Sequence, residues 1–181
     1  MNIKSREPVF ILIAAVSLDG RITVGEKEGS EWTSKEDKKF FQAEMDRADA
    51  VVMGHKTFDA IKRPLKPRNR IVFSRSPLVK GVPDAERAGV VVFVGPPKKL
   101  LTLLQERSWH RITIVGGTQI YDWFLKHSLV DEIYLTLEPV VFGSGRPLFS
   151  QNLRNLSPYR LTSIKKLNKQ GTLLLHCKVK K

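Results

Sequence analysis

The sequence is poor in the side chains that form covalent cross-links and metal sites. Its 181 residues contain one cysteine, Cys177, which excludes an internal disulfide and any zinc site built from cysteine pairs. Cys177 stands in an alternating run of apolar residues, which favours a buried structural thiol. Among the four histidines, His55 and His110 favour structural or solvated roles, and no metal site is expected.

Long hydrophobic runs are absent as well. No apolar stretch approaches the roughly 20 residues that a membrane span needs. The most apolar opening stretch, residues 9–16, has the length of a strand and lacks the small-residue cleavage site of a signal peptide. We therefore expect a cytoplasmic protein that makes no membrane contact.

Acidic residues are the scarce charge. The chain has 31 Lys and Arg against 18 Asp and Glu, a net charge of +13, which predicts attraction to anions. The cations are dispersed along the sequence with few aromatic neighbours, whereas a nucleic-acid-binding module clusters its bases and interleaves aromatic residues. Such a module stays a distant alternative, and no specific nucleic-acid partner is expected.

A hydrophobic content of 41% in 181 residues is enough to bury a real core. No linker and no internal repeat divides the sequence, so residues 1–181 are expected to form a single domain. The oligomeric state stays open between a monomer and a homodimer.

Apolar runs alternate with helical patterns along the chain. The expected strands cover residues 9–16, 50–53, 70–74, 90–94, 111–115, 132–137, 160–166 and 172–179. Helices are expected from a capping box at Thr33–Glu36, over 56–61, over 98–106, and from a cap at Thr118 to about Lys126. The pattern predicts an α/β domain with a mostly parallel sheet of about eight strands, helices on both faces and an antiparallel C-terminal edge.

Two strand-to-helix junctions are candidate anion sites. At Gly116–Thr118, paired glycines end a strand and open a helix, which aims backbone N–H groups at one point. At Gly54–Thr57, a glycine, two cationizable side chains and a hydroxyl occupy a second junction, and Ser74–Ser76 adds a guanidinium between two hydroxyls. These features favour a dinucleotide in the crevice between the junctions, with tight or solvated turns as the alternative. The glycine pair is not the G-x-G-x-x-G fingerprint, so a standard Rossmann assignment is unsupported.

Asp37 is the candidate acid. It lies at the start of an expected helix and shares a face with Phe41, because the two are four residues apart. Partial burial beside aromatic rings would raise its pKa and suit it to hold a ring edge or relay a proton. The alternative is an acid at a helix start that only favours the helix dipole.

Five short segments together resemble dihydrofolate reductase in their order and spacing. They cover residues 31–41, 52–61, 63–68, 114–121 and 133–136 and span nearly the whole chain. The resemblance implies the fold of that superfamily and the reduction of 7,8-dihydrofolate to 5,6,7,8-tetrahydrofolate, with NADPH as hydride donor.

The resemblance also assigns roles to individual residues. Asp37 falls on the acid that binds the amino-pyrimidine edge of the pterin, Thr136 on its hydroxyl partner and Trp32 on a tryptophan that orders a site water; with Tyr121 they form the implied catalytic group. The implied substrate contacts are Ile13, Phe41, Ile61, Leu65, Val115 and Arg68, the last of which would fork onto the glutamate carboxylate. The implied cofactor contacts are Ala15, Ile22, Gly54, His55, Lys56, Thr57, Ser74, Arg75, Gly116, Gly117, Thr118, Gln119 and Ile120.

Two segments depart from this pattern. Residues 17–22 and 139–149 look more like the related reductase of riboflavin synthesis, which shares the fold and NADPH but reduces a ribosylamino-pyrimidine phosphate. Against this alternative, Val115 stands directly before the glycine pair where that reductase usually carries an acid, and Asp37 with Arg68 supplies one residue for each end of folate. Dihydrofolate is therefore the expected small-molecule substrate, and the pyrimidine phosphate is the alternative.

Overall fold

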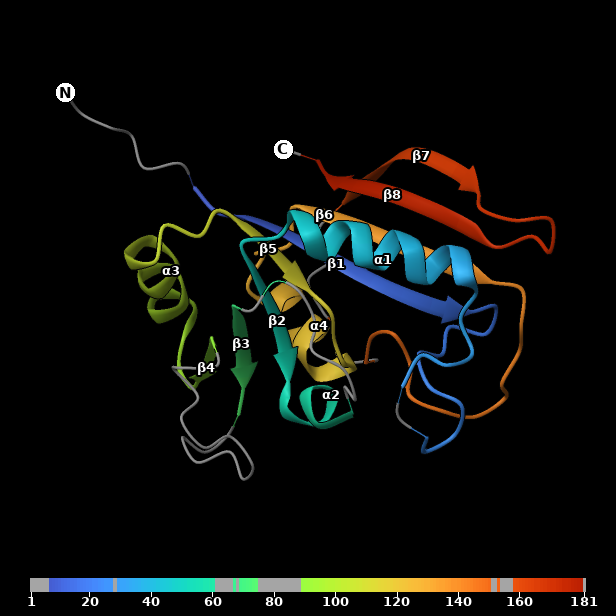
Figure 1. The fold of residues 1–181 in the computed structure, drawn as a ribbon, viewed down its shortest axis with the longest axis horizontal. Coiled ribbons are helices and arrows are strands. Elements are labelled where there is room, and N and C mark those ends of the chain that lie inside the picture. Colours follow the sequence, from blue (N-terminus) through green and yellow to red (C-terminus); the bar gives the residue numbers. More distant parts are fainter. Residues whose placement is uncertain are drawn as a thin grey trace.

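The computed structural model describes residues 7–27, 29–60, 67, 69–74, 89–150, 153 and 158–180. Within them, one eight-stranded sheet has the order β4-β3-β2-β5-β1-β6-β8-β7 (Figure 1). The strands are β1 (Val9–Ser17), β2 (Ala50–Gly54), β3 (Arg70–Phe73), β4 (Val90–Phe93), β5 (Arg111–Ile114), β6 (Glu132–Glu138), β7 (Tyr159–Lys166) and β8 (Leu173–Val179). The helices are α1 (Lys35–Arg47), α2 (His55–Ala60), α3 (Pro97–Glu106) and α4 (Thr118–Lys126).

Strand β1 is central, as its continuous apolar run predicts. It pairs in parallel with β5 on one side and with β6 on the other, and Ile11 and Leu12 are fully buried. Strands β1 to β6 are mutually parallel, whereas β8 and β7 run antiparallel at one edge. The predicted fold class, with its antiparallel C-terminal edge, is confirmed.

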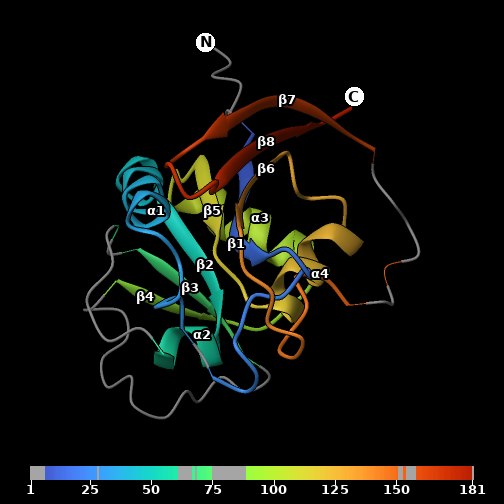
Figure 2. The same ribbon diagram turned by 90° about the vertical axis from the view of Figure 1, so that its right-hand side faces the viewer.

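Helices cover both faces of the parallel part of the sheet. Phe10, Leu12 and Ala14 of β1 face a core cluster completed by α3 and α4, whereas Ile11 and Ile13 face the cluster completed by Met45 of α1. Figure 2 shows α1 and α4 on opposite sides of the sheet. Full burial of each such side chain stabilises the fold by about 1.5–3 kcal/mol, so β1 anchors both layers.

Helix α1 begins one residue later than the expected capping box. Its N-cap is Ser34, whose hydroxyl accepts a hydrogen bond from the Asp37 N–H, whereas the Thr33 hydroxyl donates to the Ser30 carbonyl. Glu36 does not close a box on Thr33, because the Thr33 N–H donates to the Ser30 carbonyl; the Ser34 N–H, at the observed N-cap, donates to the Glu138 carboxylate of β6. At the observed N-cap, a carboxylate from a distant strand therefore takes the place that an acid three residues later has in a capping box.

The expected cap at Thr118 is also wrong. The N-cap of α4 is Gly117, which has no side chain to cap with, and Thr118 is the first helical residue. Its hydroxyl donates instead to the Pro147 carbonyl. The start of α4 is thus fastened to the 139–149 segment.

Strands β7 and β8 form the predicted hairpin, closed by a hydrogen bond from the Leu167 N–H to the Thr172 carbonyl. Most of β7 is exposed, in keeping with its place at the sheet edge. Cys177 of β8 is half-buried rather than buried, and its partner on the edge strand β7, Leu161, is exposed. No helix in the described ranges is long and apolar enough to cross a membrane.

Candidate active site

The two predicted anion junctions lie side by side at the carboxyl ends of β2 and β5. The Gly54 N–H donates to the Gly116 carbonyl at 2.8 Å, and the Val115 N–H donates to the Val52 carbonyl at 3.0 Å. A Cβ on Gly54 would lie 3.1 Å from Ile120 Cγ1, so α4 packs directly against the end of β2. The expected crevice between the junctions is therefore flanked by the two segments that the sequence singles out.

The glycine pair forms an open cradle. Gly116 has φ +109°, and a Cβ there would lie 2.9 Å from the Tyr121 Oη, so no other residue fits without a shift. A Cβ on Gly117 would meet only Thr57 Oγ1 at 3.8 Å and Ile22 Cδ1 at 4.0 Å. The cradle thus lies between two predicted cofactor contacts at a helix start, which fits a phosphate-bearing dinucleotide.

The hydroxyl of Tyr121 is hydrogen-bonded within the protein. Its buried hydroxyl donates to the Ile13 carbonyl at 2.9 Å. Burial, with a smaller contribution from the Asp37 charge, raises the pKa of Tyr121 far above its ordinary value. The phenol is therefore neutral, and its hydrogen bond ties α4 to the middle of β1.

Asp37 is the buried acid of this region, as expected from the resemblance. It lies in the first turn of α1 and is only 7% exposed. Burial raises its pKa above the ordinary 3.8, the Thr136 and Thr33 hydroxyls oppose that rise, and the Glu138 charge adds to it. Its environment therefore moves proton exchange toward neutral pH, as a proton-relaying acid requires.

Glu138 is a site residue that the sequence analysis missed. It is 4% exposed, and it accepts hydrogen bonds from the Ser34 N–H at 2.7 Å and from the Thr172 hydroxyl at 2.6 Å. It therefore ties the start of α1 to β6 and to the start of β8, beside Asp37. The available signal was the alternation of β6, which puts Glu138 on the same face as Thr136.

Trp32 lies two residues before Ser34, the N-cap of α1. Its ring contacts the Phe142 ring edge-on, with centroids 4.9 Å apart. Its indole N–H is buried and finds no acceptor in the part of the chain that the structure describes. A cavity of about 130 Å³ adjoins the ring and is lined by Val24, Lys27, Gly29, Glu31 and Trp32.

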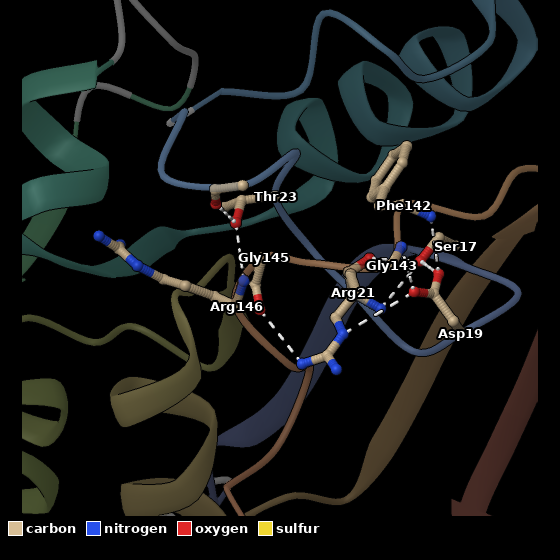
Figure 3. Close-up of polar contacts among 9 residues, drawn as sticks. Ser17, Asp19, Arg21, Thr23, Phe142, Gly143, Gly145 and Arg146 are labelled. Carbon is tan, nitrogen blue, oxygen red and sulfur yellow. Dashed lines mark hydrogen bonds and ion pairs between the residues drawn. The ribbon is translucent and has the colours of Figure 1, made fainter.

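The segments 17–22 and 139–149 meet through Asp19, which the sequence analysis did not single out. The Asp19 carboxylate accepts from the Ser17 hydroxyl at 2.6 Å, the Phe142 N–H at 3.1 Å and the Gly143 N–H at 2.9 Å (Figure 3). Nearby, Arg21 donates to the Gly145 carbonyl at 3.2 Å. These contacts hold the two segments together.

The same two segments also join through backbone contacts close to α4. The Ile22 N–H donates to the Arg146 carbonyl, and the Arg146 N–H donates to the Thr23 hydroxyl, both at 2.8 Å. A Cβ on Gly145 would lie 2.1 Å from the Thr23 carbonyl oxygen, so glycine is required for this approach. The two segments that depart from the dihydrofolate reductase pattern therefore form one structural unit.

The other predicted contacts fall into three groups. Ile13, Phe41 and Val115 share one apolar cluster, and Ala15 stands in register with Thr136 on the neighbouring strand. At the junctions, Lys56 and Gln119 are exposed, His55 lies 3.2 Å from Asp59 in an ion pair if it is protonated, and the Ser74 N–H donates to the Phe93 carbonyl. Ile61, Leu65, Arg68 and Arg75 lie outside the described residues.

The sequence matches the RibD C-terminal domain family over residues 8–173. It is 30% identical over 177 residues to the uncharacterized protein YwjB of Bacillus subtilis (strain 168), covering 90% of this chain and 89% of that protein. A putative dihydrofolate reductase of Caenorhabditis elegans is 31% identical over 134 residues, with 67% of this chain and 68% of that protein covered.

The fold resembles that of a putative riboflavin biosynthesis protein from Shewanella sp. PV-4. The TM-score is 0.75, the identity is 23%, and the match covers 96% of this chain and 99% of that chain. The family match and the dihydrofolate reductase relative confirm a member of the dihydrofolate reductase superfamily with RibD-like features, as the resemblance of the sequence implies.

Proposed function

The chain belongs to the RibD C-terminal domain family, whose reductases use NADPH, and from this premise we propose that it reduces a ribosylamino-pyrimidine phosphate. The order of the two substrates named by the sequence analysis is thereby reversed: the pyrimidine phosphate takes the place of dihydrofolate. The reason is that the family match spans almost the whole chain, whereas the folate motifs are short blocks within it.

One structural observation carries the choice of substrate. The segments 17–22 and 139–149, which look like the riboflavin-pathway reductase, are joined by Asp19 and by the Ile22–Arg146 contact at the site. The two segments therefore act as one structural unit, so their resemblance to the riboflavin-pathway reductase concerns a single region of the protein. A unit of this kind, beside both the cradle and Trp32, favours the substrate that its sequence resembles.

The glycine cradle supports the placement of NADPH. Gly116 and Gly117 would hold the pyrophosphate, with Thr57 and Ile22 on its walls, and Ala15 at the end of β1 would face the nicotinamide. NADPH, when bound, supplies the hydride. The share of the protein is to align the two ligands and to exclude water from the path between them.

The chemistry of the substrate gives Asp37 a role. A ribosylamine opens to an imine, whose carbon accepts a hydride while its nitrogen gains a proton, so that the C=N bond becomes a C–N single bond. Asp37, whose pKa is raised by burial, holds or relays that proton at the nitrogen. The indole N–H of Trp32, which has no acceptor among the described residues, offers the substrate a hydrogen-bond donor.

Dihydrofolate is the second candidate. Asp37 with Thr136 fits the amino-pyrimidine edge of a pterin, and the half-buried Phe41 and Val115, which pack against the same core cluster as Ile13, offer apolar contacts to a flat ring. Both ligands carry a pyrimidine edge, so these residues alone do not separate them.

Turnover separates the two substrates. The purified chain should oxidise NADPH when offered the ribosylamino-pyrimidine phosphate and should do so much more slowly with dihydrofolate, with NADH as the cofactor control. Turnover on dihydrofolate alone would overturn the assignment. Asp37→Asn is the matched variant, because it keeps the shape of the side chain and removes the titrating group.

A further inference from the structure

Asp19 lies outside both the glycine cradle and the Asp37 pocket, yet its carboxylate holds the segment that carries Phe142. We propose that Asp19 is a positioning residue of the active site: it fixes residues 142 and 143 so that the Phe142 ring holds Trp32 in place just before α1. The kinetic consequences rest on the proposed function, but the structural step needs no substrate.

The first link is the grip of the carboxylate. Oδ1 of Asp19 accepts from the Ser17 hydroxyl and from the Phe142 N–H, and Oδ2 accepts from the Gly143 N–H (Figure 3). Both oxygens are therefore used, and two consecutive backbone N–H groups are held at once. The same contacts, the Ser17 hydroxyl first, hold the pKa of Asp19 below its ordinary value, so the carboxylate is charged at neutral pH.

The second link is the ring contact. Phe142 meets Trp32 edge-on, with an interplanar angle of 89°. Side chains close to Phe142 give the segment little apolar anchoring, because Val141 is 67% exposed and Leu18, which pairs with Val140, is 58% exposed. A surface segment with few buried apolar contacts depends on its polar contacts for its conformation.

The third link leads to the reacting groups. Trp32 directly precedes Thr33, whose hydroxyl acts on the pKa of Asp37. The indole N–H of Trp32 is buried and has no acceptor within the described ranges, so a bound substrate is the natural partner for it. Losing the grip of Asp19 therefore misplaces a substrate contact that lies beyond direct reach of the carboxylate.

The test follows the environment of Trp32 in the free protein. The emission of Trp32 is obtained as the difference between the wild type and Trp32→Phe, and the same difference is taken in Asp19→Ala and in Asp19→Asn. Asp49→Ala is the matched control, because the Asp49 carboxylate also accepts from two consecutive backbone N–H groups, those of His110 and Arg111, at the opposite end of the sheet. Val141→Ala controls for a change in the segment that leaves the carboxylate contacts intact.

We expect acrylamide to quench the Trp32 emission about two- to threefold more strongly in Asp19→Ala, since Phe142 and Gly143 lose their carboxylate contacts, and to an intermediate degree in Asp19→Asn. The two control variants should leave the quenching unchanged. Unchanged quenching in folded Asp19→Ala, or an equal change in Asp49→Ala, would overturn the proposal. If Asp19→Ala does not fold, Asp19→Asn decides by the same criterion.

A kinetic arm ties the link to the reaction. Asp19→Ala should raise the KM for the ribosylamino-pyrimidine phosphate, and Trp32→Phe in the same background should add little, because both changes remove one contact. Additive effects on KM would contradict the link between the two residues. A protein that turns over neither substrate would count against the proposed function and leave the fluorescence result to decide on Asp19.

Discussion

At the scale of single residues, Asp37 shows a conflict between stability and chemistry. Its carboxyl is buried where its charged form is poorly solvated, and the nearby Glu138 charge adds to the cost. The unfolded chain has no such cost. An acid at position 37 therefore costs stability, and we expect that it is present because the reaction needs it.

Asp37→Asn should raise the free energy of unfolding at neutral pH. A carboxyl whose pKa is raised in the folded state binds its proton more tightly there, so ionisation above that pKa destabilises the fold. Each kcal/mol regained should raise Tm by about 2–4 °C. The gain should shrink as the pH falls toward 3.8, the ordinary pKa of the carboxyl. Thermal unfolding of both proteins across this range checks the sign, and a less stable variant at pH 7 contradicts it.

The same variant should lose hydride transfer. Removal of a proton-relaying group typically costs about 10²- to 10⁴-fold in rate. NADPH should still bind, because the cradle lies between β5 and α4 and not on α1. Single-turnover rates and cofactor titrations, made on one sample, measure the two effects separately; an unaltered rate would remove Asp37 from the mechanism.

Gly116 is the second residue whose environment dictates its identity. Gly116→Ala should destabilise the fold by about 1–3 kcal/mol more than Gly171→Ala, because an added methyl meets the Tyr121 hydroxyl. Gly171 is the matched control: its φ is +104° against +109° for Gly116, but nothing lies within 4 Å of its Cβ position. Urea unfolding of the two variants measures the difference, and equal losses would mean that backbone conformation alone decides.

At the scale of elements, Glu138 joins three pieces of secondary structure. It holds the start of α1 through Ser34 and the start of β8 through Thr172, while standing on β6 itself. This contact also explains why α1 begins at Lys35: the Ser34 N–H has a partner from a distant strand. Its charge acts on the pKa of Asp37 at the same time.

Glu138→Gln should shift the pH at which Asp37 controls the reaction to a lower value. Removing a neighbouring negative charge favours the ionised form of Asp37 and lowers its pKa. The amide can keep both contacts if the Thr172 hydroxyl turns to accept. The pH–rate profile measures the shift; Glu132→Gln, on the same face of β6, is the control that should leave the midpoint in place. A midpoint that moves equally in both variants would contradict a local effect.

The elements themselves could be predicted well from the sequence, and their ends less well. The buried run of β1 and the alternation of β8 follow from short-range periodicity. The N-cap of α1 could not be predicted from local spacing, because its N–H binds Glu138, which is 104 residues away in the sequence. The cap at Thr118 failed for the same reason, since Pro147 takes its hydroxyl.

The site was predictable in part for a related reason. Glycines at two strand ends point to a crevice, because parallel strands bring their carboxyl ends to one edge. Asp37 was singled out by its spacing from Phe41 at a helix start, the resemblance gave it a role, and its burial is consistent with that role. Asp19 and Glu138 were missed, because an acid that accepts backbone N–H groups from a distant segment leaves no local pattern.

At the scale of the whole molecule, the net charge and the family both indicate ligands that carry phosphates. The net charge of +13 suits a protein whose cofactor and proposed substrate both carry phosphates. The fold places the cradle and the buried acid at one end of a single sheet, where the carboxyl ends of β1, β2 and β5 meet. The segments clamped by Asp19 complete that end.

The association rate of NADPH should fall by about three- to tenfold as salt rises from about 0.01 to 0.3 M, because screening weakens attraction between the cationic protein and an anion. The dissociation rate should change less. Stopped-flow binding at several salt concentrations gives both rates. An association rate that ignores salt would mean that the cations lie away from the site.

The most direct test of the account is the fate of the hydride itself. The purified chain is given NADPH carrying deuterium at the transferred position, together with equal amounts of the ribosylamino-pyrimidine phosphate and dihydrofolate, and the products are resolved by mass. We predict that the deuterium appears in the pyrimidine product, at the sugar carbon bonded to the amino nitrogen. Deuterium in tetrahydrofolate alone would contradict the account.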